Sequence, residues 1–291
     1  MAGERGSIYA EQARLLERRA YPDEQFVCRL ASPLCARHAQ PGQFVHLRCE
    51  EHIPMRRPLS IQRADADAGW IELLFKTHGH GLRALSRHDP GAAVDLLGPI
   101  GNGFPAPAAG TLPVLLGGGV GIPPLLFLAE RLAAAGGPHP VAFFGSELPF
   151  PFELLDSRLP LPGAAAAASI ADLERIGVAG RLASAAGQPG CFEGFVTELA
   201  AGWLATLPAE RLRQCVIYAC GPEPMLAAAQ ALARRHGLAS WLCLEEYMAC
   251  GVGGCAGCTV PLLIDGRPAM KRVCVDGPVF PGPAVYPAAG A

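Results

Sequence analysis

Three closely spaced cysteines near the carboxyl end of the sequence constrain the fold more than any other feature. They follow the spacing C-x4-C-x2-C at Cys250, Cys255 and Cys258, and a fourth cysteine, Cys274, lies farther along. This spacing is the plant-type pattern for a 2Fe–2S cluster held by four thiolates. The glycines between the cysteines favour the same interpretation, because they lack the Cβ atoms that would block backbone N–H groups or disfavour positive φ. These glycines are Gly251, Gly253, Gly254 and Gly257.

Structural zinc, a disulfide pair and scattered core cysteines are the alternatives for these residues. Structural zinc sites usually have two similar short knuckles, whereas here one crowded loop faces a single distant cysteine. The fourth ligand is also open, because Cys243 lies seven residues before Cys250, while Cys274 lies beside the turn signal Asp276-Gly277-Pro278. The candidate ligand set is Cys250, Cys255, Cys258 and Cys274.

The charge balance and the cysteine count narrow the classes of partner and location. Charged residues make up 17% of the 291 residues, and the formal net charge is −2, so we expect neither nucleic acid nor a membrane surface as a partner. The uncharged run 96–129 is long enough to cross a bilayer, but glycines and prolines interrupt it repeatedly. Eleven cysteines and no export signal in the first twenty residues predict a cytoplasmic location.

The first part of the chain has the pattern of an antiparallel barrel. Short apolar runs separated by turn residues predict strands at 26–30, 44–48, 71–75 and 94–97. Arg57-Pro58-Leu59-Ser60 offers a planar guanidinium for a phosphate, a fixed φ and a hydroxyl that can hydrogen-bond a cofactor edge. Two glycines in the segment 76–82 would let backbone N–H groups approach a pyrophosphate, although both segments also read as surface turns.

The middle of the chain has the pattern of a nucleotide-binding sheet. Apolar runs at 112–116, 141–144 and 215–219 predict buried parallel strands, and the first leads through Gly117-Gly118-Gly119-Val120-Gly121 into a helix predicted at 125–135. A glycine loop that enters a helix is an anion site, and ligands of such sheets lie at the strand ends. Ile122 replaces the third glycine of G-x-G-x-x-G, which disfavours an ordinary Rossmann dehydrogenase. The alanine-rich run 163–184 is hard to place, and its composition favours a helix with variable edges.

Four of these segments occur in the order found in the ferredoxin–NADP reductase superfamily. Residues 57–60 resemble its flavin motif, residues 117–121 its nicotinamide-nucleotide loop, and Cys220-Gly221-Pro222 with Met225 its C-terminal motif. The cysteine loop and the segment 273–280 are similar to one branch of that superfamily, the electron-transfer subunits of two-subunit, NAD-linked dihydroorotate dehydrogenases.

The resemblance implies an α+β multi-domain oxidoreductase subunit. It implies an antiparallel β-barrel flavin domain at 1–107, an α/β parallel-sheet nucleotide domain at 108–240 and a small C-terminal iron–sulfur domain at 241–291. The implied cofactors are FAD, a 2Fe–2S cluster and NAD. The implied partner is an FMN-containing dihydroorotate dehydrogenase catalytic subunit in a heterotetramer. Electrons from dihydroorotate would pass through the cluster and FAD to NAD in pyrimidine biosynthesis. Exposed residues around 251–257 would face that partner.

The resemblance also implies the residues of the two nucleotide sites. Those expected at FAD are Arg57, Pro58, Leu59, Ser60, Leu74, Phe75, Lys76, Gly81 and Leu82. Family members often carry arginine at position 76 and threonine or serine at position 82. Those expected at NAD are Gly117, Gly118, Gly119, Gly121, Gly221 and Pro222. Cys220 would approach the hydride path as a catalytic residue, or else be a small buried hydrophobe.

Electron counting favours a flavin independently of the resemblance, because a nicotinamide exchanges electron pairs while an iron–sulfur cluster exchanges single electrons.

Two other functions compete with that of a dihydroorotate dehydrogenase electron-transfer subunit. The chain could serve a ferredoxin–NADP transhydrogenase, a sulfide dehydrogenase or a hydrogenase complex as a related FAD and 2Fe–2S subunit. It could also be a non-enzymatic, zinc-bearing adaptor on a reductase scaffold.

Overall fold

A computed structural model describes residues 8–137, 139–161 and 167–288 of the chain. The chain divides into two compact units. Unit 1 is Met1–Phe104 together with Leu244–Val279, and unit 2 is Pro105–Cys243 together with Phe280–Ala291. The cysteine segment therefore shares a compact unit with the N-terminal strands. The division into three domains with boundaries at 107 and 240 stays a prediction.

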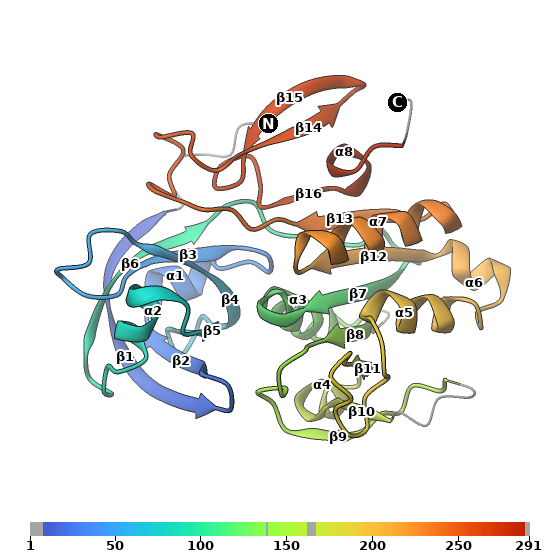
Figure 1. The fold of residues 1–291 in the computed structure, drawn as a ribbon, viewed down its shortest axis with the longest axis horizontal. Helices are drawn as coiled ribbons and strands as arrows, with labels where there is room; N and C mark the ends of the chain where they lie inside the picture. The colour runs from blue at the N-terminus through green and yellow to red at the C-terminus, as the bar shows by residue number, and fades with distance from the viewer. Residues whose placement is uncertain (1–7, 138, 162–166, 289–291) are drawn as a thin grey trace. The chain divides into compact units, whose positions relative to one another are not determined.

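The N-terminal part of unit 1 is a closed antiparallel barrel with the strand order β1-β2-β5-β4-β3-β6 (Figure 1). The barrel confirms the predicted architecture, and each of the four predicted strands lies within an observed one. The strands are β1 (Tyr9–Tyr21), β2 (Gln25–Ala31), β3 (Phe44–Arg48), β4 (Arg57–Asp65), β5 (Trp70–Lys76) and β6 (Ala93–Ile100). Two short helices, α1 (Pro33–His38) and α2 (Gly79–Leu85), lie between strands.

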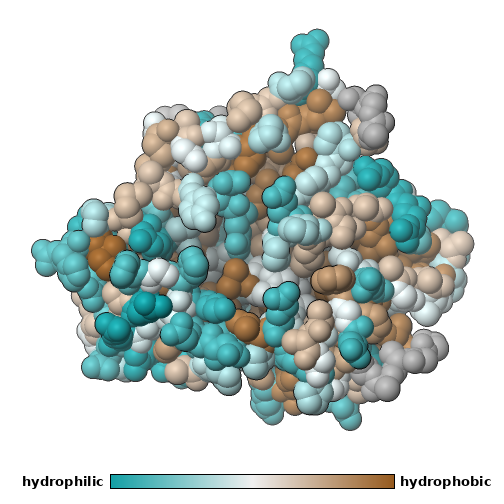
Figure 2. Space-filling model, viewed as in Figure 1, coloured by the Kyte–Doolittle hydropathy of each residue, from teal (hydrophilic) through white to brown (hydrophobic). Residues whose placement is uncertain are grey.

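The C-terminal part of unit 1 contains an antiparallel hairpin of β14 (Thr259–Ile264) and β15 (Arg267–Arg272). Asp265 and Gly266 join the strands with φ values of 49° and 73°. An Asp-Gly pair with two positive φ angles is the two-residue turn whose twist matches a hairpin. Figure 2 shows apolar residues at the surface where Figure 1 draws these strands, and Met270 is 64% exposed.

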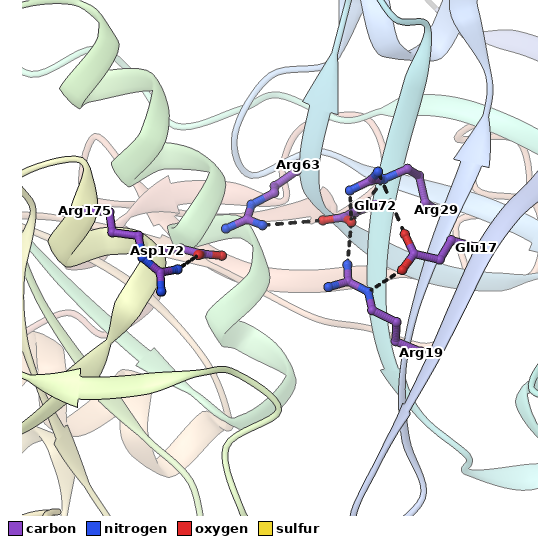
Figure 3. A network of polar contacts seen from close by, with 7 residues as sticks. All are labelled: Glu17, Arg19, Arg29, Arg63, Glu72, Asp172 and Arg175. Atoms are coloured by element: carbon purple, nitrogen blue, oxygen red, sulfur yellow. Dashed lines mark hydrogen bonds and ion pairs between the residues drawn. The ribbon is translucent and has the colours of Figure 1, made fainter.

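A buried carboxylate on β5 is paired with arginines from three other strands of the barrel (Figure 3). The Glu72 side chain is fully buried, and its Oε1 accepts hydrogen bonds from Arg19 at 2.6 Å and from Arg29 at 2.8 Å. Arg63 on β4 forms a longer ion pair with Glu72 at 3.7 Å, and the Arg29 guanidinium also lies 4.2 Å from the centroid of the Trp70 ring. A lone buried carboxylate would be costly, so these arginines stabilise the barrel by compensating it.

The core of unit 2 is a six-stranded sheet with the order β11-β8-β7-β12-β13-β16, and its pairs from β11 through β13 are parallel. Helix α3 packs on β7 and β12, α5 on β7 and β8, and α7 on β12 and β13. The sheet strands are β7 (Leu112–Gly118), β8 (Val141–Gly145), β11 (Ala179–Ala183), β12 (Cys215–Cys220), β13 (Ala239–Cys243) and β16 (Val279–Pro281). The other elements are η1 (Gly119–Gly121), α3 (Ile122–Ala134), β9 (Leu154–Asp156), β10 (Ala168–Ile170), α4 (Ala171–Arg175), α5 (Val196–Leu204), α6 (Ala209–Arg213), α7 (Glu223–His236) and α8 (Gly282–Val285).

The helix predicted over the alanine-rich run 163–184 is wrong. Residues 163–166 lie outside the described residues, and those from 168 to 183 form β10, the short helix α4 and β11. Residues 179–183 at the end of this run instead pair in parallel with 141–145 of β8, and this long-range pairing prevails there over local helix propensity.

The uncharged run 96–129 does not form one long helix. It contains the end of β6, the whole of β7 and the beginning of α3. Among the described residues, no helix has the length and apolar character needed to cross a membrane.

Candidate functional site

The four candidate ligands lie in unit 1 as two pairs of thiols. Cys258 Sγ lies 3.3 Å from Cys274 Sγ, and the Cys255 side chain hydrogen-bonds that of Cys250. Cys258 and Cys274 are buried, whereas Cys255 is exposed. The described residues contain no group of three or more His, Cys, Asp or Glu side chains arranged to hold a single metal ion. The paired arrangement fits a 2Fe–2S cluster, in which each iron takes two thiolates.

The backbone of the cysteine loop favours the thiolate form of Cys250. The Val252 N–H lies 3.5 Å from Cys250 Sγ, and the Gly257 N–H lies 3.4 Å from Cys255 Sγ. Burial raises the pKa of Cys250, but hydrogen bonds from backbone N–H groups, that of Val252 first, outweigh burial and lower the pKa to about 7. Because iron binds thiolates, these N–H groups stabilise the ligand form. Burial and the neighbouring Cys258 raise the pKa of Cys274 to about 12, so its deprotonation depends on the bound metal.

Two of the loop glycines have the backbone conformation that the sequence predicts. The φ angles are +68° at Gly251 and +81° at Gly253. A Cβ at Gly253 would overlap the Val275 side chain, and one at Gly251 would lie 2.7 Å from His46 Nδ1 on β3. Arg272 Nη1 donates a hydrogen bond of 3.0 Å to the Gly253 carbonyl. The loop is therefore in close contact with the Cys274 segment on one side and with the barrel on the other.

A second connection joins the barrel to the segment after Cys274. The Asn102 side chain donates hydrogen bonds of 3.1 Å to the carbonyls of Val275 and Asp276, and its backbone N–H donates to the Gly277 carbonyl at 2.6 Å. Gly101 has a φ of +90°, and a Cβ there would overlap Pro278. Sequence reasoning missed Gly101 and Asn102, because nothing local to them indicates a contact so distant in the chain.

His46 is the other residue that sequence reasoning missed. Its side chain is fully buried, and neither ring nitrogen has a hydrogen-bond partner of good geometry within the described residues. Burial, followed by the positive charge of Arg56, lowers the pKa of His46 to about 4 despite contact with the Cys250 backbone. The available signal was one polar residue inside the apolar run of β3.

The structure brings together two of the segments predicted to bind FAD. Arg57, at the start of β4, lies against Gly81 in α2, where a Cβ would come within 3.0 Å of Arg57 Nε. Arg57 Nη1 donates a hydrogen bond of 2.7 Å to the Met55 carbonyl, so the guanidinium is held at this place. Pro58 and Ser60 are half-buried on the same strand, and Leu59 is buried. A guanidinium held against a glycine is an arrangement that can bind a phosphate.

The remaining residues predicted at FAD differ in what they can offer. Leu74 and Phe75 on β5 are buried, and the Phe75 ring stacks on Phe26 with centroids 5.8 Å apart. Because they are consecutive on a strand, their side chains point to opposite faces of β5, and both are buried there. Lys76 is exposed at the end of β5, and Leu82 is half-buried in α2.

In unit 2, the predicted nucleotide loop meets the loop that follows β12. The strands end at the same level, because Gly117 pairs with Cys220 across β7 and β12. A Cβ at Gly118 would lie 2.5 Å from Met225 Sδ, and one at Gly221 would lie 2.8 Å from the same atom. A Cβ at Gly121 would overlap the Cys220 carbonyl. Gly119 has a φ of +54°, and Pro222 is the residue before α7. The loops thus converge at the carboxyl end of the sheet, which is where such sheets bind ligands.

The Cys220 side chain is fully buried at this strand end. This burial agrees with the alternative of a small buried hydrophobe. A catalytic role for Cys220 stays a prediction.

Comparison with known families and proteins finds similar proteins along almost the whole chain. The family model described as the iron–sulfur cluster binding domain of dihydroorotate dehydrogenase B matches residues 245–286. The chain is 35% identical over 281 residues to the dihydroorotate dehydrogenase B (NAD(+)), electron transfer subunit, of Geobacillus thermodenitrificans, and the match covers 94% of this chain and 97% of that protein. The subunit of the same name from Bacillus caldolyticus is 35% identical over 280 residues, with the same coverage.

Solved structures resemble the chain over most of its length. The structure of an NADH-dependent reduced ferredoxin–NADP oxidoreductase, from work on flavin-based electron bifurcation, matches with a TM-score of 0.75 and 25% identity, covering 94% of this chain and 90% of that chain. A ferredoxin–NADP+ reductase from Neisseria gonorrhoeae, with bound FAD and NADP, matches with a TM-score of 0.57 and 16% identity, covering 80% of this chain and 92% of that chain. The second match shows the fold alone.

We expect Cys255→Ser to abolish the visible absorption of the cluster, because a serine hydroxyl is a poor substitute for an iron-bound thiolate. NADH binding should stay measurable, since the glycine loop lies in unit 2. The measurement is the absorption spectrum and iron content of anaerobically purified protein. Cys191→Ser, which changes a half-buried cysteine in unit 2, is the control and should leave the spectrum intact. An unaltered spectrum for Cys255→Ser would falsify the ligand assignment.

We expect Arg57→Ala to weaken FAD binding by about 10- to 100-fold, because a charge-assisted hydrogen bond contributes roughly 1.5–3 kcal/mol. The measurement is flavin retained after extensive dialysis, followed by titration with FAD. Arg14→Ala, at an exposed position on β1, is the matched control and should retain flavin like the unaltered chain. Full flavin occupancy of Arg57→Ala after dialysis would remove Arg57 from the site.

Proposed function

We infer the function of the chain from the premise that it belongs to the family of dihydroorotate dehydrogenase B (NAD(+)) electron transfer subunits, as 35% identity along almost its whole length shows. It is the electron-transfer subunit of an oxidoreductase that uses FAD, a 2Fe–2S cluster and NAD. The observation that carries this function is the packing of two cysteine pairs against the barrel that carries Arg57 and Ser60.

Different residues of the chain are assigned to FAD and to NAD. Bound FAD supplies the exchange between electron pairs and single electrons that NAD and the cluster require. We assign Arg57 and Gly81 to the flavin phosphates and Ser60 to the edge of the ring, which their contact and partial burial support. In unit 2, we assign the pyrophosphate of NAD to backbone N–H groups of the loop Gly117–Gly121, because Pro123 and Pro124 at the start of α3 have no N–H to donate.

The chain acts with a catalytic partner, as the names of its relatives imply. We propose that this partner is an FMN-containing subunit that oxidises dihydroorotate, and that two copies of each chain form a heterotetramer. In this complex the chain itself never contacts dihydroorotate. A cytoplasmic location for the complex agrees with the eleven cysteines, none of which forms a disulfide within the described residues.

The surface beside the cysteine loop supports a docking site for the catalytic subunit. Tyr247 is 93% exposed three residues before the first candidate ligand, and Val252 inside the loop is 49% exposed. Exposed apolar residues of this kind mark interaction sites, and tyrosine is enriched at interface hot spots. Single electrons pass between carriers that lie close together, so the partner must approach the loop that carries Cys255.

One observation favours a second candidate, a subunit of a ferredoxin–NADP oxidoreductase, because such a structure matches the chain with a TM-score of 0.75. Its sequence identity is 25%, whereas the dihydroorotate dehydrogenase B subunits reach 35% over 281 residues. The similarity in sequence therefore favours the dihydroorotate-linked function.

We expect the chain, purified with whatever it binds in cell extract, to carry a flavin-containing partner and to reduce NAD with dihydroorotate. The measurement is anaerobic formation of NADH by the co-purified complex, with ferredoxin and NADPH as competing substrates in parallel assays. Ferredoxin-dependent activity without dihydroorotate-dependent activity would support the second candidate instead.

We expect Tyr247→Ala to weaken the complex by at least about tenfold, because truncation of an interface hot spot costs roughly 2 kcal/mol or more. The measurement is the dissociation constant for the catalytic subunit, with flavin and iron content checked in the same preparation. Phe195→Ala is the control, because Phe195 is an aromatic residue that is 63% exposed in unit 2. Equal affinities for Tyr247→Ala and the unaltered chain would exclude this docking surface.

A further inference from the structure

His46 is a buried polar side chain whose ring nitrogens make no hydrogen bond of good geometry within the described residues. Its exposed fraction is 0%, and the polar groups nearest the ring are the backbones of Cys250 and Arg56. An imidazole carries at least one N–H donor in every protonation state. A buried donor without an acceptor is costly, so each such group in a native protein calls for an explanation such as an unseen ion or ligand.

His46 contacts both of the segments that one-electron transfer must connect. In the barrel, it pairs with Pro58 across β3 and β4, so it is directly beside the flavin motif. On its other side, the ring lies close to the cysteine loop, because a Cβ placed on Gly251 would be 2.7 Å from His46 Nδ1. Gly251 follows Cys250, a candidate ligand whose backbone also contacts the ring.

The nearby arginine is not an equivalent donor, because its hydrogen bonds are directed elsewhere. Arg56 Nη2 pairs with an Asp95 carboxylate oxygen at 2.7 Å, and its Nη1 donates to the carbonyls of His46 and Asp95 at 3.2 and 3.0 Å. Arg56 thus holds β3 and β6 together beneath the ring. With the Arg56 guanidinium bound to Asp95 and to the His46 carbonyl, the His46 ring is the polar group of β3 that lies against Gly251.

We propose that His46 is a positioning residue for electron transfer, whose ring N–H donates a hydrogen bond to a sulfur atom at the cluster next to Gly251. This proposal rests on the proposed cluster site. The sulfur atom is either the Cys250 thiolate or an inorganic sulfide of the cluster, and either accepts a hydrogen bond. Donation to sulfur stabilises the reduced cluster, which carries more negative charge, and therefore raises its reduction potential. The same bond ties the cluster loop to the strand that pairs with the flavin motif.

A spectroscopic measurement on the unaltered protein tests the contact directly. In protein grown with ¹⁵N-histidine, pulsed electron paramagnetic resonance of the reduced cluster should detect a ¹⁵N coupling. His46→Gln should abolish that coupling, whereas His52→Gln should retain it, because His52 has a side chain that is 80% exposed. An iron-loaded, unaltered protein without a ¹⁵N coupling would overturn the proposal. An iron-free protein would instead contradict the cluster site on which the proposal rests.

A second experiment separates hydrogen bonding from packing. His46→Phe keeps a ring of similar size but has no donor, so the midpoint potential of the cluster should shift to more negative values. His46→Gln supplies an amide N–H and should bring the potential back toward that of the unaltered protein. Loss of the cluster in His46→Phe with retention in His46→Gln would also support donation. An unchanged potential in cluster-bearing His46→Phe, or loss of the cluster but not of FAD in both variants, would reduce His46 to a packing residue. If His46→Phe does not fold, the ¹⁵N coupling of the unaltered protein decides.

Discussion

The close approach of the cysteine loop to the barrel is the constraint on which the rest of unit 1 depends. The loop reaches the barrel at Gly251 over His46, and the segment after Cys274 reaches it at Gly101 and Asn102. At Gly101 and Gly251, an added Cβ would come within 2.8 Å of atoms in the other part of the unit, so one of the two would have to shift. Cys255, Cys258 and Cys274 lie between these two contacts in the sequence, and Cys250 directly precedes the first, so the cysteine segment is held against the barrel at both ends.

Barrel closure extends this constraint to the flavin motif. Strand β6, which ends just before Gly101, pairs with both β1 and β3, and β3 pairs with β4. His46 therefore lies on the strand next to the one that carries Arg57 and Ser60, and Asn102 follows the next strand beyond it. On the other side of β4, the buried Glu72 network joins four strands and prevents them from separating without exposing uncompensated charge. The placement of Arg57 relative to the cysteine loop thus follows from strand pairing and close contacts within one unit.

Much of this organisation could be predicted from local sequence, and what could not depends on contacts between distant residues. The cysteine loop and strands such as β3 were predictable, because ligand spacing and apolar runs are local properties. Strand β1 was not predicted, because its arginines look like a solvated segment until Glu72 is placed beside them. The run 163–184 was assigned to a helix because alanine propensity is local, whereas pairing of β11 with β8 is not. His46 and Asn102 have roles that only the folded chain reveals.

Two different physical requirements can explain the glycines of the loop in unit 2, which are phosphate binding and close packing against a neighbouring loop. Gly117-Gly118-Gly119-Val120-Gly121 reads as a phosphate-binding loop, yet Gly118 and Gly121 also have no room for a side chain, because the loop after β12 lies against them. Loss of nucleotide binding on substitution of Gly118 would therefore not prove contact with a phosphate, since displacement of Met225 would have the same effect. Gly119 is the position that separates the two causes. It has open space around its Cα but a φ of +54°, so an alanine there would test backbone conformation without disturbing the neighbouring loop.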